Sequence, residues 1–272
     1  MKSIKLIVKI IFIVSAFLII FNKIDLNKVK TIQINYPLLL FLAFIFFNLS
    51  QIISALRIHK YLKNINVTPT LKKQIMLYYV GMFYNTLLPG GIGGDAYKTY
   101  KFQKSYNKSY TKIIKALLID RISGLFAIFV LIGCLIGLSS FKKYLFLIAL
   151  IFSPIILYFI QTIFFKEFSF YPFIYSLIIQ ILQGFSFILI LLSLGINTNL
   201  IDFLILFYIS SIISVIPISI GGVGLRELTF LYGLSLLNLD PTIGVVGAFL
   251  FFIISLISSA FGIIFIKGVE NV

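Results

Sequence analysis

Two stretches of this chain combine a proline, a pair of glycines and a cation at matching offsets. The first is PGGIGGDAYK, residues 89–98, and the second is PISIGGVGLR, residues 217–226. A proline ends a helix, and glycines let the backbone turn sharply or approach a ligand closely. A helix that starts after such glycines presents free N–H groups and a positive dipole end, which favour an anion such as phosphate. The paired motifs therefore predict an anion-binding site built from two helix-breaking elbows.

The predicted site draws its residues from both motifs and from two positions near them. The helix breaks are Pro89 and Pro217, and the predicted substrate-binding residues are Asn85, Gly93, Gly94, Asp95, Lys98, Arg121, Gly221, Gly222, Arg226 and Glu227. We expect the two elbows to bring Lys98 and Arg226 together at one anion pocket. In the alternative interpretation, the glycines only permit tight helix packing and the prolines only mark loops.

Arginine is rare in this chain, because nearly all of the positively charged residues are lysines. The three arginines are Arg57, Arg121 and Arg226. A guanidinium is a planar fork of donors that suits phosphate or carboxylate. Arg121 lies in an apolar run, where a charge usually faces a cavity or a partner. Its alternatives are an ion pair with Glu227 or Asp95, or snorkelling toward the cytoplasm. Adjacent helical residues diverge by about 100°, so Glu227 cannot share the direction of Arg226.

The elements that position these residues must lie in a membrane. The 272 residues are 60% hydrophobic and 11% charged, with a mean hydropathy of +1.11, whereas soluble domains are about 25% charged. The net charge of +15 fits the positive-inside bias and anionic lipid headgroups, and we exclude nucleic acid as a partner. Cys134 is the only cysteine and His59 the only histidine. We expect His59 at the surface of a basic loop, and we predict no disulfide, metal or other cofactor.

The spans follow from the apolar segments and from the lysines between them. Apolar segments fall at residues 4–21, 36–56, 74–88, 116–138, 144–165, 173–194, 200–216, 228–238 and 242–266. The loop 57–73, which includes Arg57, and the stretch 95–115 are strongly basic, so both flanks of 74–88 should be cytoplasmic. This short segment is expected to enter the bilayer and return. The segments 200–216 and 228–238 are expected to form a second hairpin that enters from outside.

We therefore predict an all-α integral membrane protein with one membrane domain, residues 1–272, and an inverted repeat of residues 1–138 and 144–272. Each half has three transmembrane helices and one re-entrant helical hairpin. If 74–88 and 200–216 cross fully, the count rises to about eight spans. The N-terminus is expected in the cytoplasm of a prokaryote, with the chain crossing the cell membrane many times. Secondary transporters commonly have such repeats, with the substrate site at interrupted helices.

Three stretches make the chain resemble the lysylphosphatidylglycerol synthase transmembrane region, or flippase-like, family. They are NTLLPGGIGGDAYKTY (85–100), DRISGL (120–125) and PISIGGVGLRELTF (217–230), and the resemblance spans essentially the whole chain. In multiple peptide resistance factors, this membrane unit is fused to a soluble aminoacyl-transferase and is held to move aminoacylated phosphatidylglycerol between leaflets. No stretch here is long and polar enough for that transferase, so lysyl transfer is not implied. The family often has arginine where this sequence has Lys98, which keeps the charge without the fork.

The resemblance implies lipid translocation, and it leaves the lipid open. Our leading prediction is a non-enzymatic flippase or transporter for an anionic, phosphate-bearing lipid, either aminoacylated phosphatidylglycerol or a polyprenyl-phosphate-linked type. One alternative is a membrane-embedded transferase on a lipid carrier, for which Asp95, Asp120 and Glu227 are the carboxylates near the membrane. The other is a non-catalytic membrane partner of a lipid or glycan synthase. The predicted partners are membrane lipids, with a homo-oligomer or a synthase left open.

Overall fold

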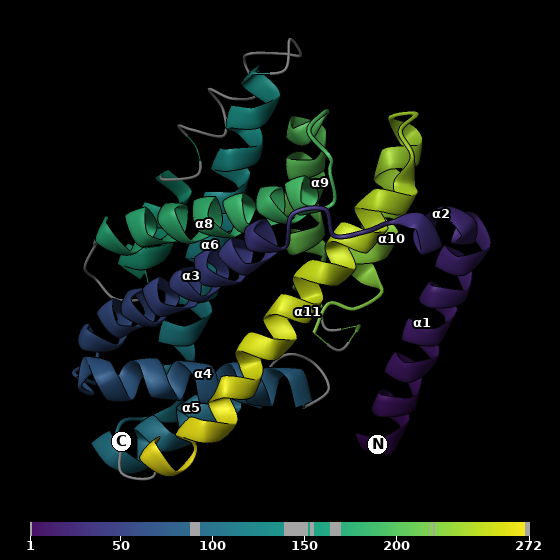
Figure 1. Ribbon diagram of the computed structural model, residues 1–272. Helices are drawn as coiled ribbons and strands as arrows, with labels where there is room; N and C mark the ends of the chain where they lie inside the picture. The colour runs from purple at the N-terminus through teal and green to yellow at the C-terminus, as the bar shows by residue number, and fades with distance from the viewer. Residues whose placement is uncertain are drawn as a thin grey trace. The chain divides into compact units, whose positions relative to one another are not determined.

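The computed structural model describes residues 2–87, 93–138, 152, 155–163, 170–216, 218–219 and 221–269, and the regular elements in these ranges are all helices. They include α1 Lys2–Lys23, α2 Leu26–Thr31, α3 Pro37–Lys63, α4 Leu71–Leu87, α5 Gly93–Tyr106, α6 Tyr110–Leu138, α8 Tyr171–Ser193, α9 Leu200–Ile213, α10 Leu225–Leu236, α11 Pro241–Phe265 and the short 3-10 helix η1 Lys267–Val269 (Figure 1). Residues 155–163 are helical as well. The predicted all-α class is confirmed.

Four of the described helices are long and apolar enough to cross a bilayer. They are α3, α6, α8 and α11, whose most apolar windows have mean hydropathies of 2.1 to 2.5. These helices cover the predicted spans 36–56, 116–138, 173–194 and 242–266. The apolar parts of α1 and α9, Ile10–Lys23 and Leu200–Ile213, are shorter. Most of the predicted span 144–165 lies outside the described residues. The inverted repeat and the re-entrant course of the hairpins stay predictions.

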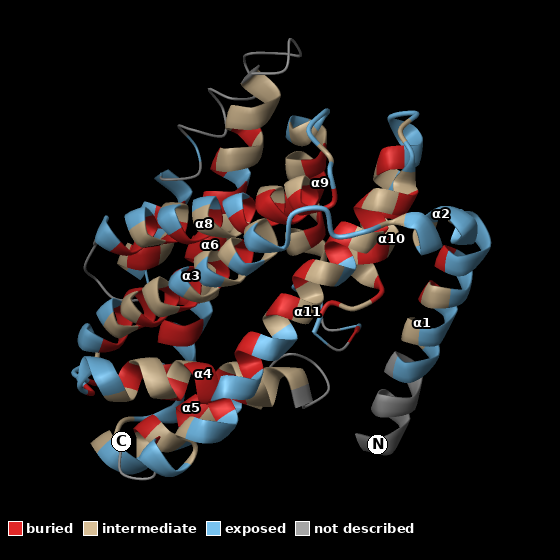
Figure 2. Ribbon diagram, viewed as in Figure 1, coloured by how far each residue is buried: buried red, intermediate tan, exposed pale blue. Residues whose placement is uncertain are grey.

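Large apolar side chains on the outside of the helices fit a lipid environment. On α1, Ile11, Leu18 and Phe21 are each more than half exposed, and on α3 so is Leu38. Figure 2 shows exposed and intermediate residues along α1. In water such a surface would be an aggregation liability. In hydrocarbon it costs nothing, because the lipid tails are as apolar as the side chains.

The chain divides into two compact units. Unit 1 comprises residues 1–47, 84–93 and 184–258, and unit 2 comprises residues 48–83, 94–183 and 259–272. In unit 1, α10 packs against both α9 and α1 (Figure 1). Aromatic rings fill the interior of this unit: the rings of Phe187 and Phe207 stack at 4.7 Å, and Phe251 meets Phe207 edge-on at 4.9 Å. The second glycine motif packs against these rings.

In unit 2, the close approach of α4 and α5 depends on two glycines. A β-carbon added to Gly94 would lie 1.9 Å from the carbonyl oxygen of Gly81, and one added to Gly81 would lie 2.3 Å from Cε of Lys98. A carbonyl in a helix backbone cannot move aside as a side chain can. Gly94 therefore sets the distance between the two helices and, through it, the position of Lys98.

We expect Gly94→Ala to destabilise unit 2, because α5 must move away from α4 to admit the methyl group. Overpacking of this kind costs about 1–3 kcal/mol. The thermal unfolding temperature of the purified protein in detergent should fall clearly. The matched control is Gly247→Ala in α11, where the new methyl meets a movable Leu191 methyl at 3.2 Å, and its effect should be smaller. Equal unfolding temperatures for the two variants would show that the α4–α5 contact is not tight.

Candidate functional site

The second glycine motif forms a sharp bend before α10. Gly221, Gly222 and Gly224 have φ angles of 63°, 83° and 84°, which a residue with a side chain adopts only with strain. Gly224 is the N-cap of α10. Pro217, the predicted helix break, lies outside the described residues. The predicted glycine-dependent bend is thus present at Gly221 and Gly222, and it starts a helix whose first turn carries Arg226.

Arg226 is half-buried between aromatic rings and a hydroxyl group. Its guanidinium carbon lies 5.4 Å from the ring centre of Phe251 and 6.0 Å from that of Phe207. Its Nη1 donates a hydrogen bond of 3.2 Å to Oγ of Ser211 on α9. Within the described part of the chain it forms no salt bridge with a carboxylate. One hydrogen bond and two aromatic rings therefore hold the guanidinium in place, and no carboxylate of the described residues neutralises its charge.

Glu227 points away from Arg226, as the helix geometry requires. Its Oε2 accepts a hydrogen bond of 2.7 Å from the backbone N–H of Gly224, which closes the first turn of α10. The side chain is fully buried, and within the described ranges its Oε1 has no hydrogen-bond partner. Glu227 therefore stabilises the helix start with one oxygen and leaves the other unused.

The first glycine motif leads into a cluster of three charges in unit 2. The Asp95 carboxylate pairs with Nζ of Lys98 at 3.1 Å and with the Arg121 guanidinium. Burial raises the pKa of Asp95, but Lys98 and Arg121 outweigh this effect and hold it below its ordinary value. Asp95 thus stays ionised, and the cluster keeps one net positive charge. Of the alternatives for Arg121, the pair with Asp95 is the one observed.

Lys98 lies deep in this cluster. It is 6% exposed, and its Nζ lies 4.9 Å from the ring centre of Tyr78 on α4. The stem runs over Gly81, whose missing side chain makes the space. Arg121 is more open, with 37% of its side chain exposed. An incoming anion would therefore reach Arg121 before Lys98.

The remaining predicted residues lie around the first motif. Gly93 and Asn85 are half-buried, at the start of α5 and near the end of α4. Gly94 is buried and faces the backbone of Gly81, so helix packing accounts for this glycine. Pro89 lies outside the described residues. Lys98 belongs to unit 2 and Arg226 to unit 1, and the shared pocket predicted for them stays a prediction.

Two residues that the sequence analysis placed in a loop belong instead to α3. This helix continues to Lys63, so Arg57 and His59 are not loop residues. Arg57 is 7% exposed, and His59 is half-buried rather than at the surface. The basic residues had suggested a loop, but Arg57 lies nearly two turns before the helix ends at Lys63. The helix that forms this candidate membrane span continues through Arg57 to Lys63.

Arg57 ties α3 to α6 and α8 inside unit 2. Its Nε and Nη2 donate to the two oxygens of Asp120 at 2.8 and 3.1 Å, and its Nη1 donates to Oγ of Ser176 at 3.0 Å. Ser176 in turn donates to Oγ of Ser123 at 3.1 Å. Asp120 and Arg121 are neighbours in sequence, and each pairs with a different element. The dipeptide thus connects α6 to α3 on one side and to α5 on the other.

A row of polar side chains on facing sides of α3 and α8 extends from this ion pair. Ser50 accepts hydrogen bonds from Gln51 at 3.0 Å and from Gln183 at 3.3 Å. The members on one face of α3 are Ser50, Ser54 and Arg57, and those on α8 are Ser176, Gln180 and Gln183. The spacing i, i+4, i+7 on an apolar helix was the signal available in the sequence. In a membrane, such bonds hold helices together.

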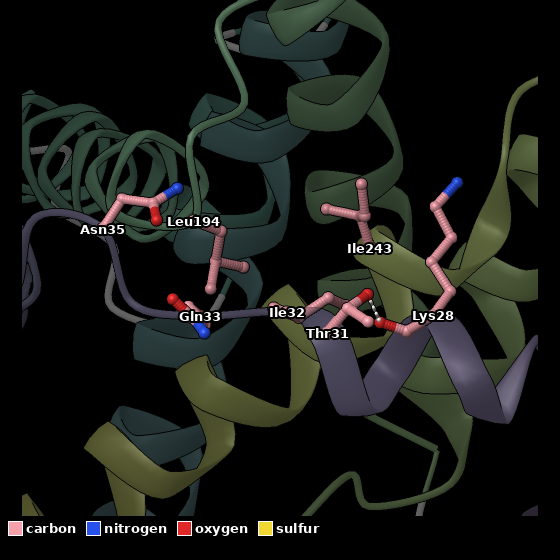
Figure 3. Close-up of a pocket in the computed structure, with 7 residues that line it drawn as sticks. All are labelled: Lys28, Thr31, Ile32, Gln33, Asn35, Leu194 and Ile243. Carbon is pink, nitrogen blue, oxygen red and sulfur yellow. Dashed lines mark hydrogen bonds between the residues drawn. The ribbon is translucent and has the colours of Figure 1, made fainter.

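A cavity of about 250 Å³ in unit 1 was not predicted (Figure 3). Its lining residues are Lys28, Thr31, Ile32, Gln33, Asn35, Leu194 and Ile243. The Lys28 ammonium points away from Gln33 and Asn35 and pairs with Asp240. The cavity therefore offers amides and a hydroxyl but no uncompensated cation for a phosphate. Among the described residues, no group of three metal-ligating side chains lies together, so we identify no residues there that could hold a metal ion.

Comparisons with known proteins agree with this picture of a membrane protein. The profile of the family described as the lysylphosphatidylglycerol synthase TM region matches residues 6–174 and 166–262, so the chain belongs to that family. It is 34% identical over 120 residues to the UPF0104 membrane protein PH1989 of Pyrococcus horikoshii. The alignment covers 43% of this chain and 36% of that relative. No solved structure matches. The chain is therefore a multi-pass membrane protein.

Proposed function

We propose that this protein moves an anionic, phosphate-bearing lipid between the leaflets of a prokaryotic cell membrane. The observation that carries the proposal is Arg226, a half-buried guanidinium without a carboxylate partner in the described part of the chain. A cation in that position is costly unless something anionic uses it. Membership of a family named for a lipid synthase's membrane region supports a lipid as that anion.

The surroundings of Arg226 suit a phosphate group in particular. The guanidinium fork matches two phosphate oxygens at once, and the rings of Phe207 and Phe251 limit its motion. Gly222 keeps the approach open, because a β-carbon there would lie 3.4 Å from Nε of Arg226. The N-terminus of α10 adds partial positive charge to the same region. These features favour a phosphodiester or phosphomonoester headgroup over a neutral one.

The cluster of Asp95, Lys98 and Arg121 provides a second cationic position for the same headgroup. Asp95 holds both cations and reduces their attraction for a lipid phosphate. A translocation site must release its ligand, so moderate attraction favours passage over trapping. We propose that Arg226 binds the headgroup and that this cluster receives or releases it. The basic stretch 95–115 would face the anionic cytoplasmic surface, with the N-terminus on the same side.

Lipid movement in reconstituted liposomes tests the proposal. The probes are fluorescent phosphatidylglycerol and fluorescent glucosylceramide, which lacks phosphate, and dithionite bleaches whichever molecules reach the outer leaflet. We expect the protein to accelerate bleaching of the first lipid well beyond protein-free liposomes and to leave the second unchanged. Equal rates for both lipids would contradict recognition of phosphate. A chemically altered lipid on chromatography would favour the transferase alternative instead.

A further inference from the structure

Glu227 has an unsatisfied oxygen in a fully buried position. The side chain is 0% exposed, and Oε1 has no hydrogen-bond partner among the residues that the structure describes. Ser219, in the same bend before α10, is 4% exposed, and its Oγ also lacks a partner in the described part of the chain. Buried polar groups are almost always hydrogen-bonded, and a buried unpaired carboxylate is especially costly. A buried carboxyl avoids that cost when it binds a proton.

Among the side chains that the structure describes, none forms a salt bridge with Glu227. On the α1 side, a β-carbon added to Gly224 would lie 3.0 Å from Cβ of Ala16 and 3.9 Å from Cε1 of Phe12, so the residues of α1 that face the start of α10 there are apolar. The charged groups with described side chains on α1 and α9 are Lys23, which lies over the Tyr232 ring, and Asp202, in the first turn of α9. Among the described charged groups, Arg226 is the one whose field acts on Glu227, yet its guanidinium faces Ser211 and two aromatic rings. The neutral acid is thus the form that this position favours.

We propose that Glu227 binds a proton from water and that the proposed lipid movement is coupled to it. This inference rests on the proposed function, because it requires an anionic headgroup at Arg226. When Oε1 carries the proton, the positive charge of Arg226 acts on the lipid phosphate alone. When the proton leaves to water, the negative charge of the new carboxylate offsets part of the positive field of Arg226 and weakens its hold on the phosphate. A proton gradient could then drive the lipid in one direction.

The sign of the pH dependence follows from this linkage. A phosphate at Arg226 makes it easier to keep the proton on Glu227, so the lipid raises the pH at which the proton is lost. By reciprocity, the proton increases lipid affinity. The affinity for the lipid is highest at low pH, where Glu227 is protonated in both the free protein and the complex. It falls as the pH rises through the range in which the free protein has lost the proton but the complex still holds it. One linked proton changes the affinity by up to about tenfold per pH unit.

Calorimetry with dihexanoyl-phosphatidylglycerol tests the coupling in the full-length wild type. This lipid is a phosphodiester, so its own charge stays constant. We expect affinity to fall with rising pH, and titrations in buffers of different ionisation enthalpy should show the uptake of up to one proton per lipid. Glu227→Gln should bind tightly at every pH. The control Asp202→Asn should keep the wild-type dependence. Affinity independent of pH in the wild type, or a pH dependence kept by Glu227→Gln, overturns the coupling.

Infrared spectroscopy of the lipid-free protein provides a second readout. At neutral pH the wild type and Asp202→Asn should show a protonated-carboxyl band that Glu227→Gln lacks, and a band unchanged in Glu227→Gln overturns the proposal. The two ideas can fail separately. If Arg226→Gln binds the lipid as tightly as the wild type does, the proposed function fails. If binding depends on Arg226 but neither on pH nor on Glu227, only the proton coupling fails.

Discussion

Replacing Arg57 with leucine is expected to destabilise the protein by about 3–5 kcal/mol. The variant leaves Asp120 buried without the guanidinium that now bonds both of its oxygens. It also removes the donor that holds Ser176 of α8. An uncompensated buried charge is among the costliest defects that a single substitution can make. SDS-induced unfolding of the purified protein measures the change, and the midpoint for Arg57→Leu should fall to a much lower SDS fraction.

A second substitution distinguishes a lost pair from a lost packing contact. In the double variant Arg57→Leu, Asp120→Leu, no charge is left buried, so much of the lost stability should return. The double-variant cycle then gives a coupling energy for the two side chains. Additive losses from the two single substitutions would contradict the pair, since independent residues do not rescue each other. Lys104→Gln, a change of charge at an exposed position, is the control and should be neutral.

Arg226→Gln is expected to weaken binding of dihexanoyl-phosphatidylglycerol by about tenfold to thousandfold. Truncating one partner of a desolvated charged contact typically costs about 2–4 kcal/mol, and about 1.4 kcal/mol corresponds to tenfold. Glutamine keeps a donor for Ser211 but loses both the charge and the fork. Arg226→Lys should lie between the two, because it keeps the charge without the paired donors.

Calorimetry at a constant acidic pH measures these affinities without interference from Glu227. Lys104→Gln removes the same charge from an exposed position on α5 and should lower affinity little. If Lys104→Gln and Arg226→Gln weaken binding equally, the effect is one of overall protein charge. That result would remove Arg226 from the binding site.

The sequence was sufficient to predict the membrane-spanning helices, because their apolar character depends only on local composition. The helices α3, α6, α8 and α11 are long and apolar enough to cross a bilayer core, and this property needs no tertiary context. The bend at Gly221 and Gly222 was predictable for a related reason. Glycine is the residue for positive φ angles, and both positions have them.

The partners of the charged residues were harder to predict. Arg121 had two candidate carboxylates, and only the fold selects Asp95. Arg57 was assigned to a loop because several basic residues follow it, whereas its true environment depends on Asp120, 63 residues away in the chain. Neither local propensity nor periodicity contains such a pairing. The spacing of Ser50, Ser54 and Arg57 on an apolar helix would have indicated a buried polar face.

The packing role of Gly94 also needed the fold. The sequence motif makes Gly93 and Gly94 equivalent candidates for ligand contact. In the structure Gly94 lies against the Gly81 carbonyl, because α4 and α5 cross at that point. A glycine motif alone does not distinguish a helix crossing from a ligand contact, since both need the same missing side chain.

An experimental structure with phosphatidylglycerol bound tests the central claim most directly. We predict density for the phosphate within hydrogen-bonding distance of the Arg226 guanidinium, with the phosphate near the start of α10. Contact of the same headgroup with Lys98 or Arg121 would further support a shared pocket. A headgroup bound elsewhere, for example in the cavity lined by Gln33 and Asn35, with Arg226 touching no phosphate oxygen, would contradict the account.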